Sequence, residues 1–474
     1  MSGTDRRTDS VPNAARVDHV GLIIAHLQKH RDPASVPSVA RDAAKTFLFD
    51  SIGVALAGAS VSESTLVLEA VSGWGQVALE GTGAHVWGSP AVWPAPTAAL
   101  INAFHIHNQE FDCVHERAVV HPMAVILAAM MAGAERQQNV SGTKFLAALA
   151  IAVDVATVIG MAASKPIRFF RPAQCGCLGA AAGLAYLEGL DEIGIKNALG
   201  LAYSQLAGTM QAHIEGTPTL ALQVAFAARA AVCAIDLAKL GFRAPHDMLD
   251  GRYGYFALIE NGAADTASFR DLGVVWQITR VSHKPYPTGR AAQGGISGLI
   301  GLMKQHGFQA QDVASVVLAA PPLIRQLVDR PYKIDMTVNY ARLCLPYLLA
   351  LTLRDGSVGL RSYTESNLRD TELAALAKRV LIESDGNTDL NALAPQRLTV
   401  GLNDGHSFST TMPQVYGSPD APMTAEAQRA KFVACCRAAP QPLAEVQIEQ
   451  LINAIQNIES LQDVSDLVAM TRSN

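Results

Sequence analysis

The segment from His105 to Pro122 holds the densest group of chemically active side chains in the chain. It contains four histidines, three acids, an arginine and a thiol: His105, His107, Glu110, Asp112, Cys113, His115, Glu116, Arg117 and His121. Apolar sequence typical of buried helices lies on both sides. Ionisable groups are costly to bury without partners, so a polar segment between core-forming helices is a candidate catalytic site.

Two kinds of chemistry fit this segment. Imidazole and carboxylate groups bind zinc or iron, and the candidate ligands are His105, His107, Asp112, His115 and His121. Their spacing matches no strong metalloenzyme motif, so we predict no metal. The second chemistry is acid–base catalysis by a histidine that a carboxylate orients. His121 is the best candidate, because it precedes Pro122 at a predicted helix start, where backbone amides favour anions. We expect structural roles for His105 and His107.

Basic residues lie close to two other predicted helix starts. Arg168 and Arg171 precede a glycine-rich helix, and a guanidinium binds a carboxylate through two parallel hydrogen bonds. Lys284 and Arg290 flank a Lys-Pro-Tyr-Pro segment that leads into another glycine-rich helix. Each pattern predicts an anion-binding loop, although solvated or structural roles are an equally simple interpretation.

Arg342 and Tyr347 lie five residues apart on one predicted helix. This spacing turns them to moderately different sides of the helix. Both are candidates for the site, and both are equally compatible with a purely structural role.

Composition limits the class of protein. The 474 residues are 49% hydrophobic and 17% charged, which indicates a large core and two domains. A net charge of −5 gives no reason to expect nucleic-acid or membrane-surface binding. The apolar run 145–163 carries Asp154 and is predicted to be a buried helix. Seven cysteines without paired CxxC motifs predict neither a zinc ribbon nor a disulfide framework, which favours a reducing cytoplasm.

The order of predicted elements indicates a mainly α protein. Residues 1–16 are predicted to be a disordered tail. Residues 17–270 show helical periodicity, apart from a possible short strand at residues 77–88. Residues 271–412 alternate between strand and helix patterns, which predicts a smaller α+β domain. Residues 413–474 return to helix, so we expect a large all-helical domain formed by both chain ends with a smaller α+β domain between them.

Taken together, these motifs resemble those of the MmgE/PrpD family, which includes 2-methylcitrate dehydratase, cis-aconitate decarboxylase and iminodisuccinate epimerase. The resemblance covers roughly residues 18–468 and is specific in combination. The matching positions are Asp50, Gly53, Gly58, Asn102, His107, Glu110-Phe111-Asp112, His121-Pro122, Glu135, Lys284 to Pro287, Ala341-Arg342, Tyr347 and Lys431-Phe432.

The resemblance implies a homodimer without metal or organic cofactor, whose active site lies between the helical domain and a lid. It places Asp112, His121, Lys284 and Tyr347 in that site. Four positions depart from the family pattern. Cys113 stands where an aspartate is frequent, Phe170-Arg171 where a histidine is frequent, Leu220 where a lysine is common, and Gln293 where a histidine is common.

These observations predict a cofactor-independent lyase of the dehydratase type, which removes a proton next to a carboxylate of a small di- or tricarboxylate. Without a metal, cationic side chains must stabilise the developing charge. Asp112 would orient His121, and Tyr347 would be the opposing acid or base. The predicted carboxylate-binding residues are Arg171, Lys284, Arg290 and Arg342. An epimerase, a decarboxylase and an inactive carboxylate-binding paralogue remain alternatives.

Overall fold

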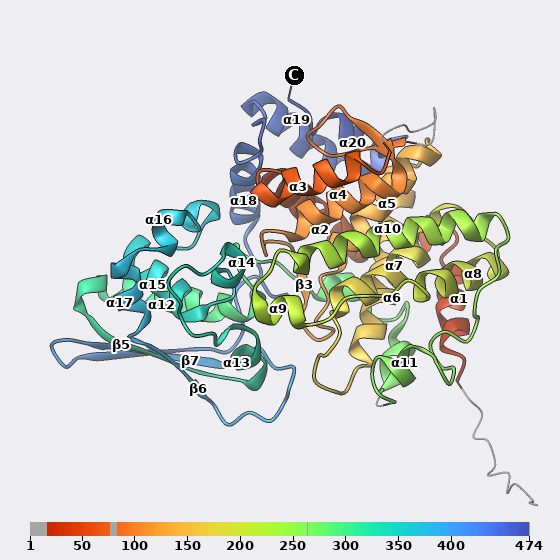
Figure 1. Cartoon of the computed structure of the whole chain (residues 1–474). Helices are drawn as coiled ribbons and strands as arrows, with labels where there is room; N and C mark the ends of the chain where they lie inside the picture. Colours follow the sequence, from red (N-terminus) through yellow and green to blue (C-terminus); the bar gives the residue numbers. More distant parts are fainter. Residues whose placement is uncertain (1–16, 76–82, 263, 474) are drawn as a thin grey trace, which may run out of the picture.

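The computed structural model describes residues 17–75, 83–262 and 264–473, and helices dominate it (Figure 1). The fold is therefore mainly α, as the sequence predicts. The expected tail at 1–16 lies outside the described residues, and so does the first half of the short strand expected near residues 77–88. The described half includes the short strand Gly83–His85.

The first part of the chain forms a layered assembly of helices. These are α1 (His19–Lys29), α2 (Ser38–Gly58), α3 (Ser62–Ser72), α4 (Ala95–His107), α5 (Pro122–Gln137), α6 (Gly142–Met161), α7 (Arg171–Leu187), α8 (Glu192–Tyr203), α9 (Gln211–Glu215), α10 (Thr219–Lys239) and α11 (Tyr255–Leu258). A short hairpin of β1 (Gly83–His85) and β2 (Val92–Pro94) lies beside α4 and α5.

Small residues let the central helices approach closely. Helix α7 packs against α6 and α5, and all of its residues are buried. A side chain added at Gly179 would lie 2.6 Å from the carbonyl oxygen of Ala152, so only glycine fits there. Helices α6 and α10 are long and apolar enough to cross a membrane, and α2 with α3 qualifies as a bent pair. In α6, 94% of the apolar window is buried against the rest of the chain, and in α10 61%. The burial of α6 matches its prediction as a core helix.

A four-stranded sheet occupies the later part of the chain, in the order β6-β5-β7-β8. Strand β5 (Val313–Ala320) pairs parallel with β6 (Val380–Ser384) and antiparallel with β7 (Gln396–Leu402). Strand β8 (Ser407–Met412) pairs antiparallel with β7 after a turn at Gly405. The helices around the sheet are α12 (Gln293–His306), α13 (Pro322–Val328), α14 (Val338–Ala341), α15 (Leu345–Asp355), α16 (Glu365–Leu368) and α17 (Thr371–Ala377).

The C-terminal helices return to the first part of the chain, as Figure 1 shows for α18 and α19. Helix α18 (Ala425–Arg437) and α19 (Glu445–Gln456) both contact α2, and α20 (Asp466–Ala469) contacts α19. The C-terminal helices thus pack on α2. The expected division into one helical body from both chain ends and a smaller α+β domain, with boundaries at 270/271 and 412/413, stays a prediction.

One strand prediction needs correction. The β-branched and aromatic stretch 274–286 predicts a full strand, but the structure has a 3-10 turn at Gln277–Arg280 and only the two-residue strand β4 (Val281–Ser282). Its partner is β3 (Val114–His115), which belongs to the histidine-rich segment. Pairing is limited to this short segment, so the remaining residues stay irregular, and the pairing places the Lys-Pro-Tyr-Pro loop next to the histidines.

Candidate active site

The histidine-rich segment is a tight connection between α4 and α5. His107 is the last residue of α4, and His121 is the N-cap of α5, with Pro122 in the first turn, where its missing N–H is tolerated. Glu110 has a φ of 53°, in the left-handed region that non-glycine residues rarely adopt. This reversal of the chain returns Asp112 toward the end of α4.

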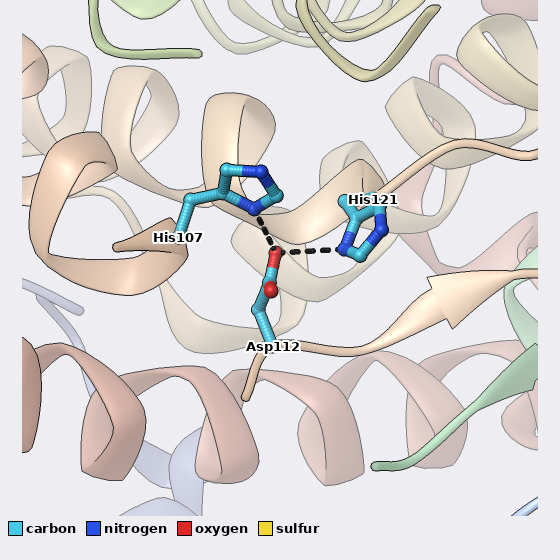
Figure 2. Close-up of side chains that lie close together, drawn as sticks. All are labelled: His107, Asp112 and His121. Carbon is cyan, nitrogen blue, oxygen red and sulfur yellow. Dashed lines mark hydrogen bonds and ion pairs between the residues drawn. The ribbon is translucent and has the colours of Figure 1, made fainter. Parts of the chain in front are cut away.

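Asp112 joins two histidines through one oxygen atom (Figure 2). Its Oδ2 lies 2.9 Å from Nδ1 of His107 and 3.1 Å from Nδ1 of His121. The two imidazole rings are edge-on to each other, with centroids 4.9 Å apart. The predicted pair of Asp112 and His121 is therefore in contact. His107 binds the same carboxylate, so it belongs to the group, and its expected structural role stays a prediction.

Lys284 adds a buried positive charge to this group. It is fully buried, and its Nζ lies 2.9 Å from Oε2 of Glu110 and 3.6 Å from Oδ1 of Asp112. Gln293 fixes the loop that carries Lys284, since its side-chain amide bonds the backbone of Tyr286 and Thr288. The position of Lys284 thus depends on Gln293, for which the sequence predicted no role.

The local charges shift the two histidines in opposite directions. Burial alone would lower the pKa of His107, but the Asp112 and Glu110 carboxylates raise that pKa above its usual value. Burial and the Lys284 ammonium lower the pKa of His121, against the pull of Asp112. Burial also opposes ionisation of both acids. The nearby cations nevertheless hold the pKa of Asp112 well below its usual range, and they hold the pKa of Glu110 at about 2.

These shifts favour the protonated form of His107, the ionised form of Asp112 and the neutral form of His121. A neutral His121 that donates from Nδ1 to Asp112 carries its lone pair on Nε2, which is the arrangement of a general base. Environments that push neighbouring pKa values apart are characteristic of acid–base sites. His121 is also the most exposed member of the trio, with 13% of its side chain accessible.

A pocket opens at His121. Its cavity volume is about 70 Å³, and both parts of the chain contribute to its lining. Its polar lining residues are Glu110, Glu116, His121, His213 and Arg290, and its apolar lining residues are Val114, Val119, Ile167, Phe170, Pro172, Met210, Leu220, Ala291, Leu323, Leu327, Leu343 and Leu393. Phe170 is the N-cap of α7, so the amino ends of α5 and α7 both lie at the pocket.

The predicted arginines have other partners. Arg171 donates to the carbonyl of Lys165 and pairs with Glu260, and it does not line the pocket. Arg342 donates to the carbonyl of Asn108 and lies over the ring of Tyr363. The structure therefore brings neither guanidinium to the pocket wall that sequence reasoning assigned to them.

Arg290 reaches the pocket but is saturated. Its Nε and Nη2 bind Oε1 of Glu116, and its remaining donors bind the carbonyls of His283, Tyr416 and Val415. All five N–H groups of a guanidinium are thus engaged. Arg290 connects the pocket wall to the chain at 415–416, and its donors are not free for a carboxylate.

Tyr347 is also removed from the pocket. Its side chain is fully buried, and its hydroxyl donates to the carbonyl of Ser362 at 3.3 Å. Burial raises the pKa of this phenol. The geometry does not support the predicted role of Tyr347 as the opposing acid or base.

Of the four positions that depart from the family pattern, two line the pocket and two do not. Cys113 is buried beside Asp50 and Asp112, which together with burial raise the pKa of its thiol well above the usual value, and it does not line the pocket. Gln293 has the structural role given above. Leu220 and Phe170 do line the pocket, and both are apolar.

Sequence reasoning missed His213 entirely. It lies on α9, lines the pocket, and contacts Nη2 of Arg330 through Nδ1 at 2.9 Å. Burial and the Arg330 charge lower its pKa to about 4, so it is neutral near pH 7. The only sequence signal was its place just before the Gly216-Thr217 turn, which did not identify a site residue.

The trio also has the spacing of a possible metal site. His107, Asp112 and His121 place one ligand atom each within 4.8 Å of one another. However, both Nδ1 atoms meet the same carboxylate oxygen, and the Lys284 ammonium 3.6 Å from the other oxygen would repel a divalent cation. The donor set therefore favours the hydrogen-bonded arrangement over metal binding.

The protein is a mainly α protein with a histidine–carboxylate group at a pocket. Comparison with known proteins identifies its family. The MmgE/PrpD N-terminal domain matches residues 23–267, and the MmgE/PrpD C-terminal domain matches residues 286–457. The chain belongs to the MmgE/PrpD family.

Similar proteins of this family are enzymes. Cis-aconitate decarboxylase of Mus musculus is 27% identical over 90% of this chain and 88% of its own length. The Homo sapiens enzyme of the same name is 27% identical over 90% and 89%. The cis-aconitate decarboxylase-like protein oryM of Aspergillus oryzae is 25% identical over 98% of both chains.

Proposed function

We propose that this protein is a lyase in which His121 moves a proton at the carbon next to a carboxylate of a small acid. The observation that carries this proposal is the contact of 3.1 Å between Nδ1 of His121 and Oδ2 of buried Asp112, at the edge of a pocket that His121 lines. The lowered pKa of His121 agrees with a role as base. A general acid–base group of this kind contributes about 10²–10⁴-fold to a reaction rate. No metal or organic cofactor is required by this chemistry.

Charge that develops on the substrate needs stabilisation. The amino ends of α5 and α7 supply positive dipole ends at the pocket, where helix amides favour anions. Protonated His107 and Lys284 compensate the Asp112 and Glu110 carboxylates, so that these acids do not repel an anionic substrate as strongly as unpaired acids would.

Two lyase reactions fit this proton transfer. In dehydration, His121 takes the C–H proton, a carbon–carbon double bond forms, and the C–O bond breaks; the leaving hydroxide takes a proton and departs as water, and His121 returns its proton to solvent. In decarboxylation, the bond to a carboxylate breaks, carbon dioxide leaves, and the carbon takes a proton that His121 relays from solvent. Dehydration is the expectation from the family, and the names of the similar proteins favour decarboxylation.

Epimerisation is less well supported. It needs a second acid–base group on the opposite face of the carbon, and Tyr347 does not line the pocket. His213 is the remaining candidate, but its low pKa near Arg330 makes it a weak proton carrier at neutral pH.

We further propose that residues 271–412 act as a lid over the helical body and that the protein works as a cytoplasmic homodimer. The lid proposal rests on the lining of the pocket. Leu323, Leu343 and Leu393 face the same cavity as His121 and Phe170.

The test is a product screen by NMR in deuterated water. Wild-type protein and His121→Ala are incubated with a panel of di- and tricarboxylic acids. We expect solvent deuterium in the product or recovered acid for the wild type and almost none for the variant. Tight binding without exchange or turnover would instead indicate a carboxylate-binding paralogue, and loss of activity with a chelator would contradict a metal-free reaction.

A further inference from the structure

The pocket wall is unusual for a site that receives a highly charged acid. Most of its lining residues are apolar, and they come from several separate segments. The leucines alone are Leu220, Leu323, Leu327, Leu343 and Leu393. An apolar wall gives no favourable contact to a second or third carboxylate, because each ionised group that loses its water without a partner costs free energy.

The charges at the wall are already paired. Glu110 binds Lys284, and Glu116 binds Arg290, whose five donors are all engaged. These pairs leave little net positive charge for a ligand. A tricarboxylate would therefore face two carboxylates with no free guanidinium or ammonium among the described lining residues.

One cationic group next to the wall has spare capacity. Arg330 is 8% exposed, its Nη2 contacts His213, and its Nη1 is buried with no hydrogen-bond partner in the described part of the chain. Arg330 does not line the pocket itself, but it contacts His213, which does, so its charge lies directly behind this part of the wall. This arrangement supplies one nearby positive charge for a carboxylate, not three.

We propose that the substrate is an acid with one or two carboxylates at the reacting end and an aliphatic arm, rather than a compact tricarboxylate. The reacting carbon lies at His121, a carboxylate lies toward His213 and Arg330, and the arm packs on the leucine wall. This proposal rests on the proposed function for its assignment of the reacting end.

The test measures dissociation constants by calorimetry for succinate and for a series of alkylsuccinates from methyl to hexyl, with citrate and cis-aconitate for comparison. Burial of each methylene should tighten binding by about three- to fourfold until the arm fills the wall. We expect the longer alkylsuccinates to bind more tightly than citrate. The inference is overturned if affinity does not change with arm length or if citrate binds more tightly.

Leu220→Lys places an ammonium on the apolar wall, so it should weaken the binding of the longest alkylsuccinate and strengthen the binding of citrate. Leu240→Lys is the matched control, because Leu240 follows the same helix and is 84% exposed. It should leave both affinities unchanged. Leu327→Lys, at a half-buried wall position, repeats the test if Leu220→Lys does not fold. Equal effects of wall and control variants would also overturn the inference.

Failure of this inference and failure of the proposed function are distinguishable. If deuterium exchanges into a tricarboxylate and the affinity for alkylsuccinates does not depend on arm length, the proposed lyase function stands and the aliphatic substrate is excluded. Arm-dependent binding with no exchange in any acid would keep the ligand class and remove the lyase.

Discussion

Two buried groups in this protein have the same composition and different chemistry. The first is the trio His107, Asp112 and His121. The second, called the α1 cluster here, consists of His26, His30 and Asp154. In it, Nε2 of His26 lies 3.4 Å from Oδ2 of Asp154, and the His26 and His30 rings are 5.2 Å apart.

The trio differs from the α1 cluster in two ways: a lysine lies beside its carboxylate, and one of its histidines lines a pocket. Asp112 has Lys284 3.6 Å away, and His121 lines a pocket. Within the described residues, Asp154 forms its ion pair with His26, and Trp276 packs against both histidines. Burial consequently raises the pKa of Asp154, whereas cations lower that of Asp112. Of the two histidine–aspartate groups, we therefore propose acid–base chemistry only for the trio, whose carboxylate is paired with a cation beside a pocket.

Removal of the proposed base should give the largest effect. His121→Ala should lower kcat by about 10²–10⁴-fold and leave the fold intact, because His121 lies at the pocket edge. His26→Ala, the matched change in the α1 cluster, should lower the unfolding temperature while kcat changes little. Steady-state kinetics and thermal unfolding of both variants check the comparison. Equal loss of kcat in both would remove the distinction.

Removal of the cation should affect both stability and pH dependence. Lys284→Met removes the lysine that Glu110 and Asp112 share. Removal of one partner of a buried ion pair lowers the free energy of unfolding by about 3–5 kcal/mol. Urea unfolding measures this loss. Since Lys284 lowers the pKa of His121, the variant should also need a higher pH for activity. Lys144→Met, which removes a half-buried lysine bonded to the Leu187 carbonyl, should leave the pH profile unchanged.

The pH profile itself tests the state of His121. A base with a lowered pKa is already neutral at pH 7, so kcat/KM should rise with pH and level off with an apparent pKa below 6.5. Replacing the positive neighbour in His107→Asn should move this rise to higher pH. An unchanged profile in His107→Asn would show that His107 does not set the charge of His121.

The folding stability should also depend on pH, but less steeply than kcat/KM does. Burial lowers the pKa of several histidines from 6.5 to about 4: His105, His115, His213 and His283. The unfolded chain therefore binds more protons than the folded chain between those values, so stability falls as the pH drops below 6.5. Calorimetry from pH 7 to pH 5 should show a falling unfolding temperature, with a smaller slope in His105→Gln. A flat curve would contradict these shifts.

Local patterns predicted much of the fold. Apolar periodicity predicted the long helices, Gly307 marked the end of α12, and β-branched runs predicted β5, β7 and β8. The strand expected at 274–286 mostly did not form, because a strand needs a partner and only β3 supplies two residues. Propensity alone does not reveal the length of a distant partner.

The site was predicted only in part, for a related reason. Residue types and helix starts pointed to His121 and Lys284, the family resemblance added Asp112 as the partner of His121, and the structure brings the three together. The arginines were chosen for their charge, but charge does not show whether donors are already used. The partners of Arg290 and Arg171, such as Glu116 and Glu260, are distant in sequence, so only the folded structure reveals them.

The most direct test of the account is the protonation state of the two histidines that share Asp112. Protein with ¹⁵N-labelled histidine is examined by NMR at pH 7, and resonances are assigned with His121→Gln and His107→Asn. We predict a neutral His121 with its proton on Nδ1 and a cationic His107. A cationic His121, or a neutral His121 with its proton on Nε2, would contradict the assignment of His121 as the base.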